Sequence, residues 1–196
     1  MKTSITSFDQ LDLSRHYTYQ DYLTWKFTER VELLLGKVFK MSPAPNVEHQ
    51  LISGRLFRNI ANYLEGSKYL VFSAPFDVRL QVSKDEQHND TVVQPDIVVV
   101  CDLGKLDEQG CNGAPDIVIE ILSPGNSRSE MKDKFELYEA SLVKEYWIVD
   151  PTHKNIIIYS LNNKNRYIGS KPFVDGEVAV TRVLQDIQLS LGDVFK

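Results

Sequence analysis

Two acidic residues interrupt strongly apolar segments of the sequence, and their side chains are the leading candidates for chemistry. Asp96 lies within residues 92–100 and Glu120 lies within residues 117–122, where most neighbours are aliphatic. An ionised carboxylate that is buried without a partner is energetically costly. Each of these acids must therefore be paired, bound to a metal ion or placed at the edge of a cleft.

The alternation of side chains along a strand limits which acids can act together. Asp116 and Glu120 would share a face of one strand, but four residues span roughly 13 Å, which is too far for one small ion. Asp96 is a better partner for Glu120 if their strands are neighbours, because paired strands lie roughly 4.8 Å apart. Two carboxylates on adjacent strands, with water and phosphate oxygens, could hold Mg²⁺ or Mn²⁺. The alternative is that each acid is buried against an arginine, a lysine or backbone N–H groups.

Several familiar catalytic and binding motifs are absent from the sequence. It contains no GxGxxG, GxxxxGK[ST], HExxH or GxSxG pattern, so nucleotide-binding folds and zinc proteases gain no support. Cys101 and Cys111 form no CxxC pair, which argues against a zinc finger and a disulfide scaffold. The four histidines lack metal-ligand spacing, and they are His16, His49, His88 and His153.

The N-terminal part is predicted to form a short helix, a hairpin and a long helix. The short helix covers residues 19–27, because Thr18 and Asp21 resemble a capping box. Alternating polarity then predicts paired strands over residues 31–35 and 38–41, with a turn at Gly36–Lys37 and an end at Pro43 and Pro45. The long helix starts at Asn46 and stops at Gly66, and its apolar positions are Val47, Leu51, Leu56, Ile60 and Leu64.

Short apolar runs after residue 68 predict the core sheet. The first four strands cover residues 69–73, 76–82, 92–101 and 116–122. Two of these strands are apolar on both faces, which is typical of central strands covered by helices on each side.

A further helix and more strands complete the predicted fold. The helix covers residues 130–141, with Phe135, Leu137, Tyr138 and Leu142 buried. The later strands cover residues 145–150, 156–161, 166–168 and 178–184, and the first of them ends at Pro151. The pattern predicts an α/β protein with a central mixed β-sheet flanked by helices and a β-rich C-terminal extension.

The composition indicates one soluble domain. The chain has 196 residues, of which 42% are hydrophobic and 25% charged, so it can bury a core without disulfides or a structural metal. It has no signal-peptide pattern and no run of about 18 apolar residues, so we expect a cytoplasmic protein without a membrane partner. The net charge is −5, and residues 77–116 hold nine acids against three bases. This argues against a broadly basic surface that coats nucleic acid.

Larger segments resemble a known family of nucleases. Pro95-Asp96, followed 24 residues later by Glu120 in an apolar strand, resembles the PD-(D/E)XK nuclease superfamily. The closer resemblance is to the Uma family of restriction-endonuclease-like proteins, and it extends over about residues 17–195. The segments that carry it are residues 32–37, 41–43, 94–96, 114–124 and 145–151, together with His49, Lys134 and Tyr138.

The resemblance implies a restriction-endonuclease-like core and metal-dependent phosphodiester hydrolysis. The core would cover about residues 17–161 of a single domain spanning 1–196, with the extension over residues 162–196. Asp96, Glu120 and the backbone carbonyl of Ile121 would bind the metal ion, Mg²⁺ or Mn²⁺. Glu32 matches a further acid that the superfamily carries on its N-terminal element.

The catalytic lysine implied by the resemblance is displaced in this sequence. The superfamily places it two residues after the glutamate, where this chain has Leu122. Within the Uma family the lysine has moved to the following helix, and Lys134 matches that place. An amine there could orient the attacking water or offset the charge that develops on the phosphate. Lys132 is the alternative, but it lies about 160° from Lys134 around the helix, so only one can face the site.

Other side chains have a structural interpretation beside a functional one. His49 could bind a phosphate or the water network of the site, or it could only cap the helix. Asp116 is expected to mark the start of a strand, and the aromatic residues Tyr138, Tyr146 and Trp147 are expected to pack in the core. Two stretches carry an excess of positive charge and could track phosphates or be ordinary solvated side chains. They contain Lys37, Lys40, Arg55 and Arg58, and Lys154, Lys164, Arg166 and Lys171.

The leading hypothesis is a Mg²⁺-dependent endonuclease that cuts nucleic acid, with DNA the expected substrate, and that forms a homodimer. The main alternative is a catalytically inactive protein that keeps the nuclease fold and binds nucleic acid or a protein partner. A third possibility is a phosphoesterase that acts on a small metabolite. The sequence does not distinguish DNA from RNA or single from double strands, because phosphate contacts carry no base information.

Overall fold

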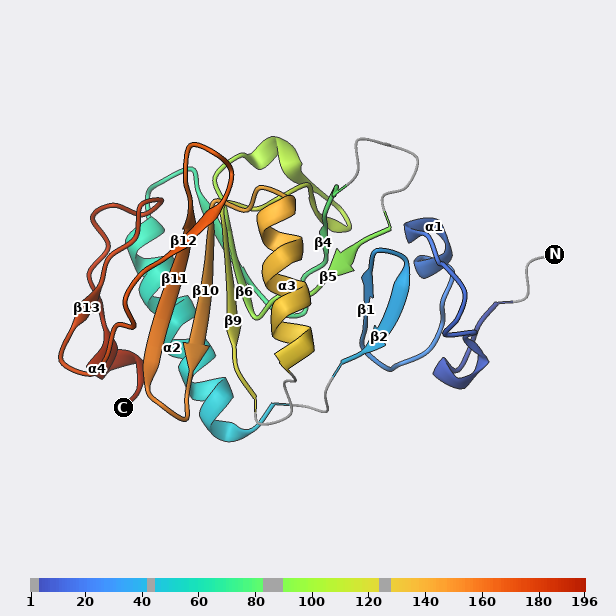
Figure 1. Cartoon of the computed structure of the whole chain (residues 1–196), viewed down its shortest axis with the longest axis horizontal. Helices are drawn as coiled ribbons and strands as arrows, with labels where there is room; N and C mark the ends of the chain where they lie inside the picture. The colour runs from blue at the N-terminus through green and yellow to red at the C-terminus, as the bar shows by residue number, and fades with distance from the viewer. Residues whose placement is uncertain (1–3, 42–44, 83–89, 124–127) are drawn as a thin grey trace.

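Two six-stranded sheets dominate the structure, a computed structural model that describes residues 4–41, 45–82, 90–123 and 128–196. Figure 1 shows the N-terminal hairpin at one end of the molecule and the C-terminal strands at the other. Some residues named in the sequence analysis lie outside the described residues. They are His88, Pro43 at the predicted strand end, and Ser42 and Pro124 of the segments that carry the resemblance.

The first sheet is built mainly from the N-terminal half of the chain. Its strand order is β2-β1-β5-β4-β8-β7. Only β4 and β8 pair in parallel, and the other pairs are antiparallel. The strands are β1 (Val31–Leu34), β2 (Lys37–Lys40), β4 (Val78–Arg79), β5 (Val92–Val93), β7 (Leu106–Asp107) and β8 (Gly110–Asn112).

The second sheet contains the longer strands and has the order β12-β11-β10-β9-β6-β3. Its strands are β3 (Leu70–Ser73), β6 (Ile97–Val100), β9 (Ile117–Ile121), β10 (Glu145–Asp150), β11 (Asn155–Leu161) and β12 (Tyr167–Gly169). The parallel pair β9 and β10 is connected through α3 (Arg128–Ala140). This connection lays α3 across one face of the sheet, as parallel neighbours require a crossover.

Helices cover both faces of the central strands, which confirms that part of the sequence prediction (Figure 1). On one face, Leu56 and Ile60 of α2 (Val47–Leu64) pack in a cluster with Ile119 of β9. On the other face, Tyr138 of α3 packs in a second cluster with Val118. Side chains therefore alternate along β9 between the two layers, and Glu120 points to the side of α3.

Several short elements complete the fold. They are η1 (Phe8–Gln10), α1 (Tyr19–Tyr22), η2 (Leu103–Lys105), β13 (Val178–Ala179), β14 (Leu189–Ser190) and α4 (Leu191–Val194). The N-terminal segment packs aromatic side chains against the hairpin of β1 and β2. The C-terminal extension contributes β12 to the second sheet and packs the region around α4 into the cluster of α2. No helix in the described ranges is long and apolar enough to cross a membrane.

The prediction of one central sheet is wrong, because the segment over residues 92–101 is not one strand. It divides into β5 in the first sheet and β6 in the second sheet. Pro95 between them has no N–H group to donate to a ladder, and it separates the two pairings. Residues 76–82, predicted for the core sheet, likewise contribute β4 to the first sheet.

The hairpin turn and the first helix also differ from the prediction. The turn residues are Leu35 and Gly36, with φ angles of 49° and 77°, and Lys37 is already in β2. Two left-handed residues are what a two-residue turn between twisted strands requires. The predicted helix over residues 19–27 is limited to α1, because Trp25 turns into the aromatic cluster and stacks on Phe27.

Three predicted core positions are exposed. Val47 and Leu51 on α2 are 77% and 50% exposed, because the buried stripe of this helix runs through His49 and Ile52 instead. Leu142 is 49% exposed, since it has a positive φ angle just after α3 and the chain turns there into β10.

Candidate active site

The register of two strands brings the two candidate carboxylates together. β6 pairs antiparallel with β9, with Ile97 opposite Ile119. Continuing this register by one residue places Asp96 opposite Glu120, and opposite residues share a face. The Oδ2 atom of Asp96 accepts a hydrogen bond of 2.8 Å from the backbone N–H of Ile121. This bond fixes the aspartate at the end of β9, beside the glutamate.

Glu120 has one carboxylate oxygen held by the protein and one left open. Its Oε1 atom accepts a hydrogen bond of 2.7 Å from the Tyr138 hydroxyl and one of 3.0 Å from Lys134 Nζ. Within the described part of the chain, Oε2 takes no hydrogen bond. Burial raises the pKa of Glu120 to about 7; the Lys134 charge opposes this shift, and the Asp96 and Glu32 charges add to it.

Lys134 lies between two acids from different sheets. Its Nζ atom is 3.0 Å from Oε1 of Glu120 and 3.2 Å from Oε2 of Glu32. Burial by itself would lower the pKa of this lysine, but the two carboxylates outweigh burial and raise the pKa. Lys132, the alternative, is exposed and pairs with Glu136 at 3.6 Å, so Lys134 is the lysine that faces this cluster.

Glu32 reaches the cluster from the first sheet. It lies on β1, is only 4% exposed, and its Oε1 atom accepts a hydrogen bond of 3.0 Å from the backbone N–H of Gln94. That N–H lies in the connection between β5 and β6. The segment that links the two sheets thus also orients the glutamate toward Lys134, and Glu32 does not point to solvent.

His49 contacts the same end of β9 from α2. Its backbone N–H is capped by the Asn46 side chain at 2.8 Å. Its Nε2 atom lies 3.2 Å from the carbonyl oxygen of Ile121 and 3.3 Å from Oδ2 of Asp96. Burial opposes protonation of this imidazole, but the hydrogen bond and charge of Asp96 outweigh it and raise the pKa. Asn46 is therefore the helix cap, and the imidazole of His49 instead contacts two groups of the cluster.

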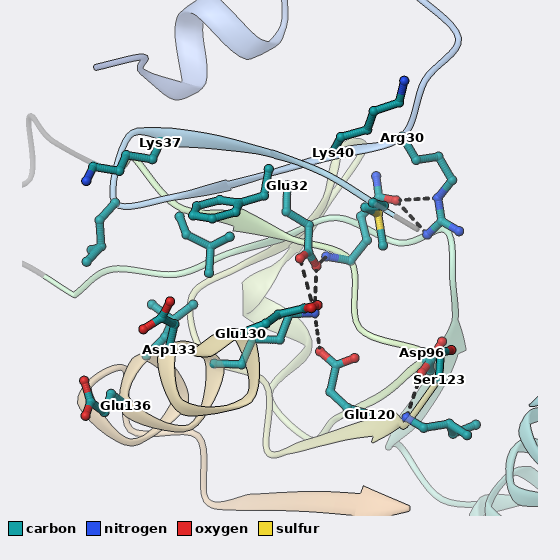
Figure 2. A pocket seen from close by; sticks show the side chains of 18 of the residues that line it. Arg30, Glu32, Lys37, Lys40, Asp96, Glu120, Ser123, Glu130, Asp133 and Glu136 are labelled. Atoms are coloured by element: carbon teal, nitrogen blue, oxygen red, sulfur yellow. Dashed lines mark hydrogen bonds and ion pairs between the residues drawn. The ribbon is translucent and has the colours of Figure 1, made fainter. Parts of the chain in front are cut away.

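These residues line a pocket of about 660 Å³ between the hairpin and α3 (Figure 2). Glu32 lies on the hairpin side, Lys134 on the helix side, and Glu120 and Asp96 at the ends of the strands of the second sheet. The pocket is large enough to enclose a molecule of moderate size. The cluster is therefore accessible to a ligand from this pocket.

The donor set of the cluster is suited to a hard divalent cation. Among the described residues, no three His, Cys, Asp or Glu side chains are grouped so that they could hold a metal ion. Two carboxylates and a backbone carbonyl are present, from Asp96, Glu120 and Ile121, and all of these donors are oxygen atoms. Mg²⁺ typically binds one or two carboxylates and completes its shell with water and phosphate oxygens. The residues therefore fit Mg²⁺ or Mn²⁺ better than a structural zinc ion.

The structure separates the other candidates from this cluster. Asp116 accepts hydrogen bonds of 2.6 Å from Cys101 N–H and from Lys144 Nζ, so it anchors the start of β9. Trp147 is fully buried in the core. Arg55 donates to the carbonyl oxygen atoms of residues 194 and 196, away from the pocket. Arg166 and Lys171 pair with Glu139 and Glu177, whereas Lys37 and Lys40 line the pocket.

Sequence reasoning missed the contribution of Tyr138 to the site. Its ring packs in the core, as predicted, but its hydroxyl also donates to Glu120. A spacing signal was available, because Tyr138 follows Lys134 by four residues and therefore lies on the same face of α3. The backbone N–H of Gln94 had no such signal, since its contact to Glu32 depends on the docking of two sheets.

The fold and family follow from comparison with known proteins. The mixed α/β fold is similar to that of a solved structure, a "putative nuclease belonging to DUF820" from Anabaena variabilis ATCC 29413. The TM-score is 0.68 at 20% identity, over 91% of this chain and 97% of that chain. The chain is also 25% identical over 152 residues, 76% of each protein, to "Uncharacterized protein slr1290" of Synechocystis sp. (strain ATCC 27184 / PCC 6803 / Kazusa). The Uma2 family model, "Putative restriction endonuclease", matches residues 19–192. The chain belongs to the Uma2 family.

Proposed function

We propose that the protein is a metal-dependent endonuclease that hydrolyses phosphodiester bonds of nucleic acid, with DNA as the expected substrate. The observation that carries the proposal is the opposed pair Asp96 and Glu120 beside the buried Lys134 in an accessible pocket. Membership of the Uma2 family supports the same reaction class.

The metal ion in this proposal is Mg²⁺ or Mn²⁺, held by Asp96, Glu120 and the carbonyl oxygen of Ile121. When bound, it would supply Lewis-acid activation of the phosphate and lower the pKa of a bound water. The protein prepares the ligands through contacts that the structure contains. Tyr138 and Lys134 hold one oxygen of Glu120, which leaves the other for a ligand. The backbone of β9 holds one oxygen of Asp96 in the same way.

Lys134 would supply a fixed positive charge to the reaction. Three carboxylate oxygens lie within 3.3 Å of its ammonium group, Oε1 of Glu120 and both oxygens of Glu32. Its positive charge would stabilise a phosphate oxygen whose negative charge increases in the transition state. The raised pKa keeps this amine protonated throughout the neutral pH range. Glu32 positions the lysine in this scheme.

The test is cleavage of supercoiled plasmid and of a labelled single strand in Mg²⁺, Mn²⁺ or EDTA. The wild type is compared with the double variant Asp96→Ala/Glu120→Ala, and Asp116→Asn, at the residue before β9, serves as the matched control. We expect metal-dependent cleavage by the wild type and the control but not by the double variant. Equal rates in all three folded proteins would reject the proposal.

One observation favours the alternative of an inactive protein that keeps the fold. Lys134 pairs with Glu120 without a metal ion, so this carboxylate has a counter-charge supplied by the protein. Metal binding distinguishes the two functions, because a ligand that binds only the folded state raises its melting temperature. A saturable shift with Mn²⁺ in the wild type that is lost in Asp96→Asn supports the endonuclease. No shift in either protein supports the inactive alternative.

A further inference from the structure

The pocket extends beyond the carboxylates into an apolar compartment. On the hairpin, Glu32 is opposite Phe39 in the strand register, so their side chains share the face that lines the pocket. Leu34 follows Glu32 by two residues, roughly 6.5 Å along the strand, on this same face. Leu34 packs in one cluster with Leu137 of α3, three residues beyond Lys134. The apolar compartment therefore lies directly beside the charged cluster.

Phe39 offers an aromatic face to this compartment. Its side chain lines the pocket yet remains 44% exposed. An exposed aromatic ring beside a phosphate-hydrolysing site is suited to stack on a nucleobase, because every base has a π-face. Leu34 and Leu137 supply the apolar surroundings that an unstacked base requires.

The two walls of the pocket carry opposite charge. The hairpin wall bears Lys37, on the same strand face as Phe39, whereas the amine of Lys40 lies over the ring of Phe8 on the other face of the hairpin. The helix wall bears the acids Glu130, Asp133 and Glu136 beside the paired Lys134. Figure 2 shows Lys37 on the hairpin and the acids Asp133 and Glu136 on α3, whereas Lys40 extends from the hairpin away from the pocket. Lys132 offsets part of the acidic wall through its contact with Glu136.

This difference in charge between the two walls favours a single-stranded substrate over a duplex. A duplex brings two anionic backbones, and one of them would have to pass the acidic helix. A single strand brings one backbone, which Lys37 on the hairpin can attract. The apolar surface between the walls can then contact the unpaired bases of the single strand.

We propose that the pocket receives an unpaired nucleotide, so that the substrate is single-stranded nucleic acid or an unpaired segment of a duplex. The backbone lies along the hairpin, the phosphate at Asp96 and Glu120, and the neighbouring base in the compartment against Phe39. This inference rests on the proposed function, since it assigns the substrate class of the same site.

The test compares cleavage of three labelled substrates of the same sequence at fixed salt: a single strand, a full duplex and a duplex with an unpaired bulge. We expect the single strand and the bulge to be cut at least tenfold faster than the duplex. Loss of a base–aromatic stack typically lowers affinity about 5- to 150-fold. Phe39→Ala should therefore lower kcat/KM on the single strand by a factor in this range. Ile168→Ala is the matched control, because Ile168 is 52% exposed on β12, outside the pocket.

A binding measurement keeps the inference separate from catalysis. The Asp96→Ala/Glu120→Ala variant is titrated in EDTA against fluorescent single strands and duplexes, and anisotropy reports the affinity. Tighter binding of the single strand, weakened by adding Phe39→Ala, supports the inference even if no substrate is cut. Absence of cleavage by the wild type on every substrate rejects the proposed function alone. Equal or tighter duplex binding, or a duplex cut as fast as the single strand, overturns the inference and leaves a nuclease of duplexes.

Discussion

Replacing Lys134 with methionine is the most informative perturbation of the cluster. The variant keeps a side chain of similar length but removes the amine that lies 3.0 Å from Glu120 and 3.2 Å from Glu32. Each contact represents an attraction of about 5 kcal/mol at an effective dielectric constant of about 20, and desolvation of the three charges offsets most of it. Breaking a buried ion pair from one side typically costs about 3–5 kcal/mol. We expect a loss of this size in the free energy of unfolding at pH 8.

The assay is urea denaturation of the wild type and Lys134→Met in EDTA at pH 8 and pH 6. Without the lysine, Glu120 becomes easier to protonate than in the wild type, where its pKa is about 7. A protonated Glu120 no longer repels Glu32, so the loss of stability should be smaller at pH 6 than at pH 8. Saturating Mn²⁺ should also restore part of the stability, because the cation replaces the missing positive charge.

Lys132→Met is the matched control for this experiment. This lysine lies on the same helix, but its side chain is exposed and its partner Glu136 is exposed as well. An exposed pair of this type contributes about 0–1 kcal/mol. Suppose that Lys134→Met lowers the free energy of unfolding at pH 8 by no more than Lys132→Met does. The ion pairs of Lys134 with Glu120 and Glu32 then do not stabilise the fold.

Three further predictions concern groups around the same strand. Tyr138→Phe removes the 2.7 Å hydrogen bond to Glu120 and should lower the free energy of unfolding by about 1–3 kcal/mol; an unchanged urea midpoint would contradict the contact. Mn²⁺ should bind more weakly as the pH falls below about 7, by up to about tenfold per pH unit, because the proton competes for Glu120; calorimetric affinities that do not change from pH 8 to pH 6 would exclude this carboxylate as a ligand. For Asp116, burial raises the pKa, but hydrogen bonds from Lys144 and a backbone N–H outweigh it and hold the pKa below the usual 3.8. The ionised Asp116 therefore stabilises the fold above pH 4, and this stabilisation is lost as the pH falls through its folded-state pKa. Asp116→Asn should make the free energy of unfolding depend less on pH on the acid side. A slope equal to that of the wild type would argue against the ion pair with Lys144.

The sequence carried enough information for the central part of the site. Apolar runs identify β6 and β9 as buried strands, and an acid within each run must face a cleft or a partner. The cap at Asn46 and the spacing of apolar residues also predict α2 closely. The approach of Asp96 to Glu120 follows once these two strands are placed side by side.

The division into two sheets could not be predicted from the pattern of apolar and polar residues. β5 and β6 are buried at every position, so the polarity pattern contains no alternation that would separate them. Only the proline between them marks the boundary, and a proline is also compatible with the start of a strand. The hydroxyl of Tyr138 presents a similar difficulty, because an aromatic residue with apolar neighbours is normally expected to pack and not to bind a carboxylate.

The separation of Glu32 and Lys134 along the chain has a consequence for synthesis on the ribosome. The two residues are 102 positions apart, and their contact joins the first sheet to α3. At a translation rate of about 5–20 residues per second, about 5–20 s pass between the appearance of the acid and that of the lysine. The strand that pairs with β9 on the far side, β10, is made later still. A nascent chain therefore holds no assembled cluster until most of its length has emerged.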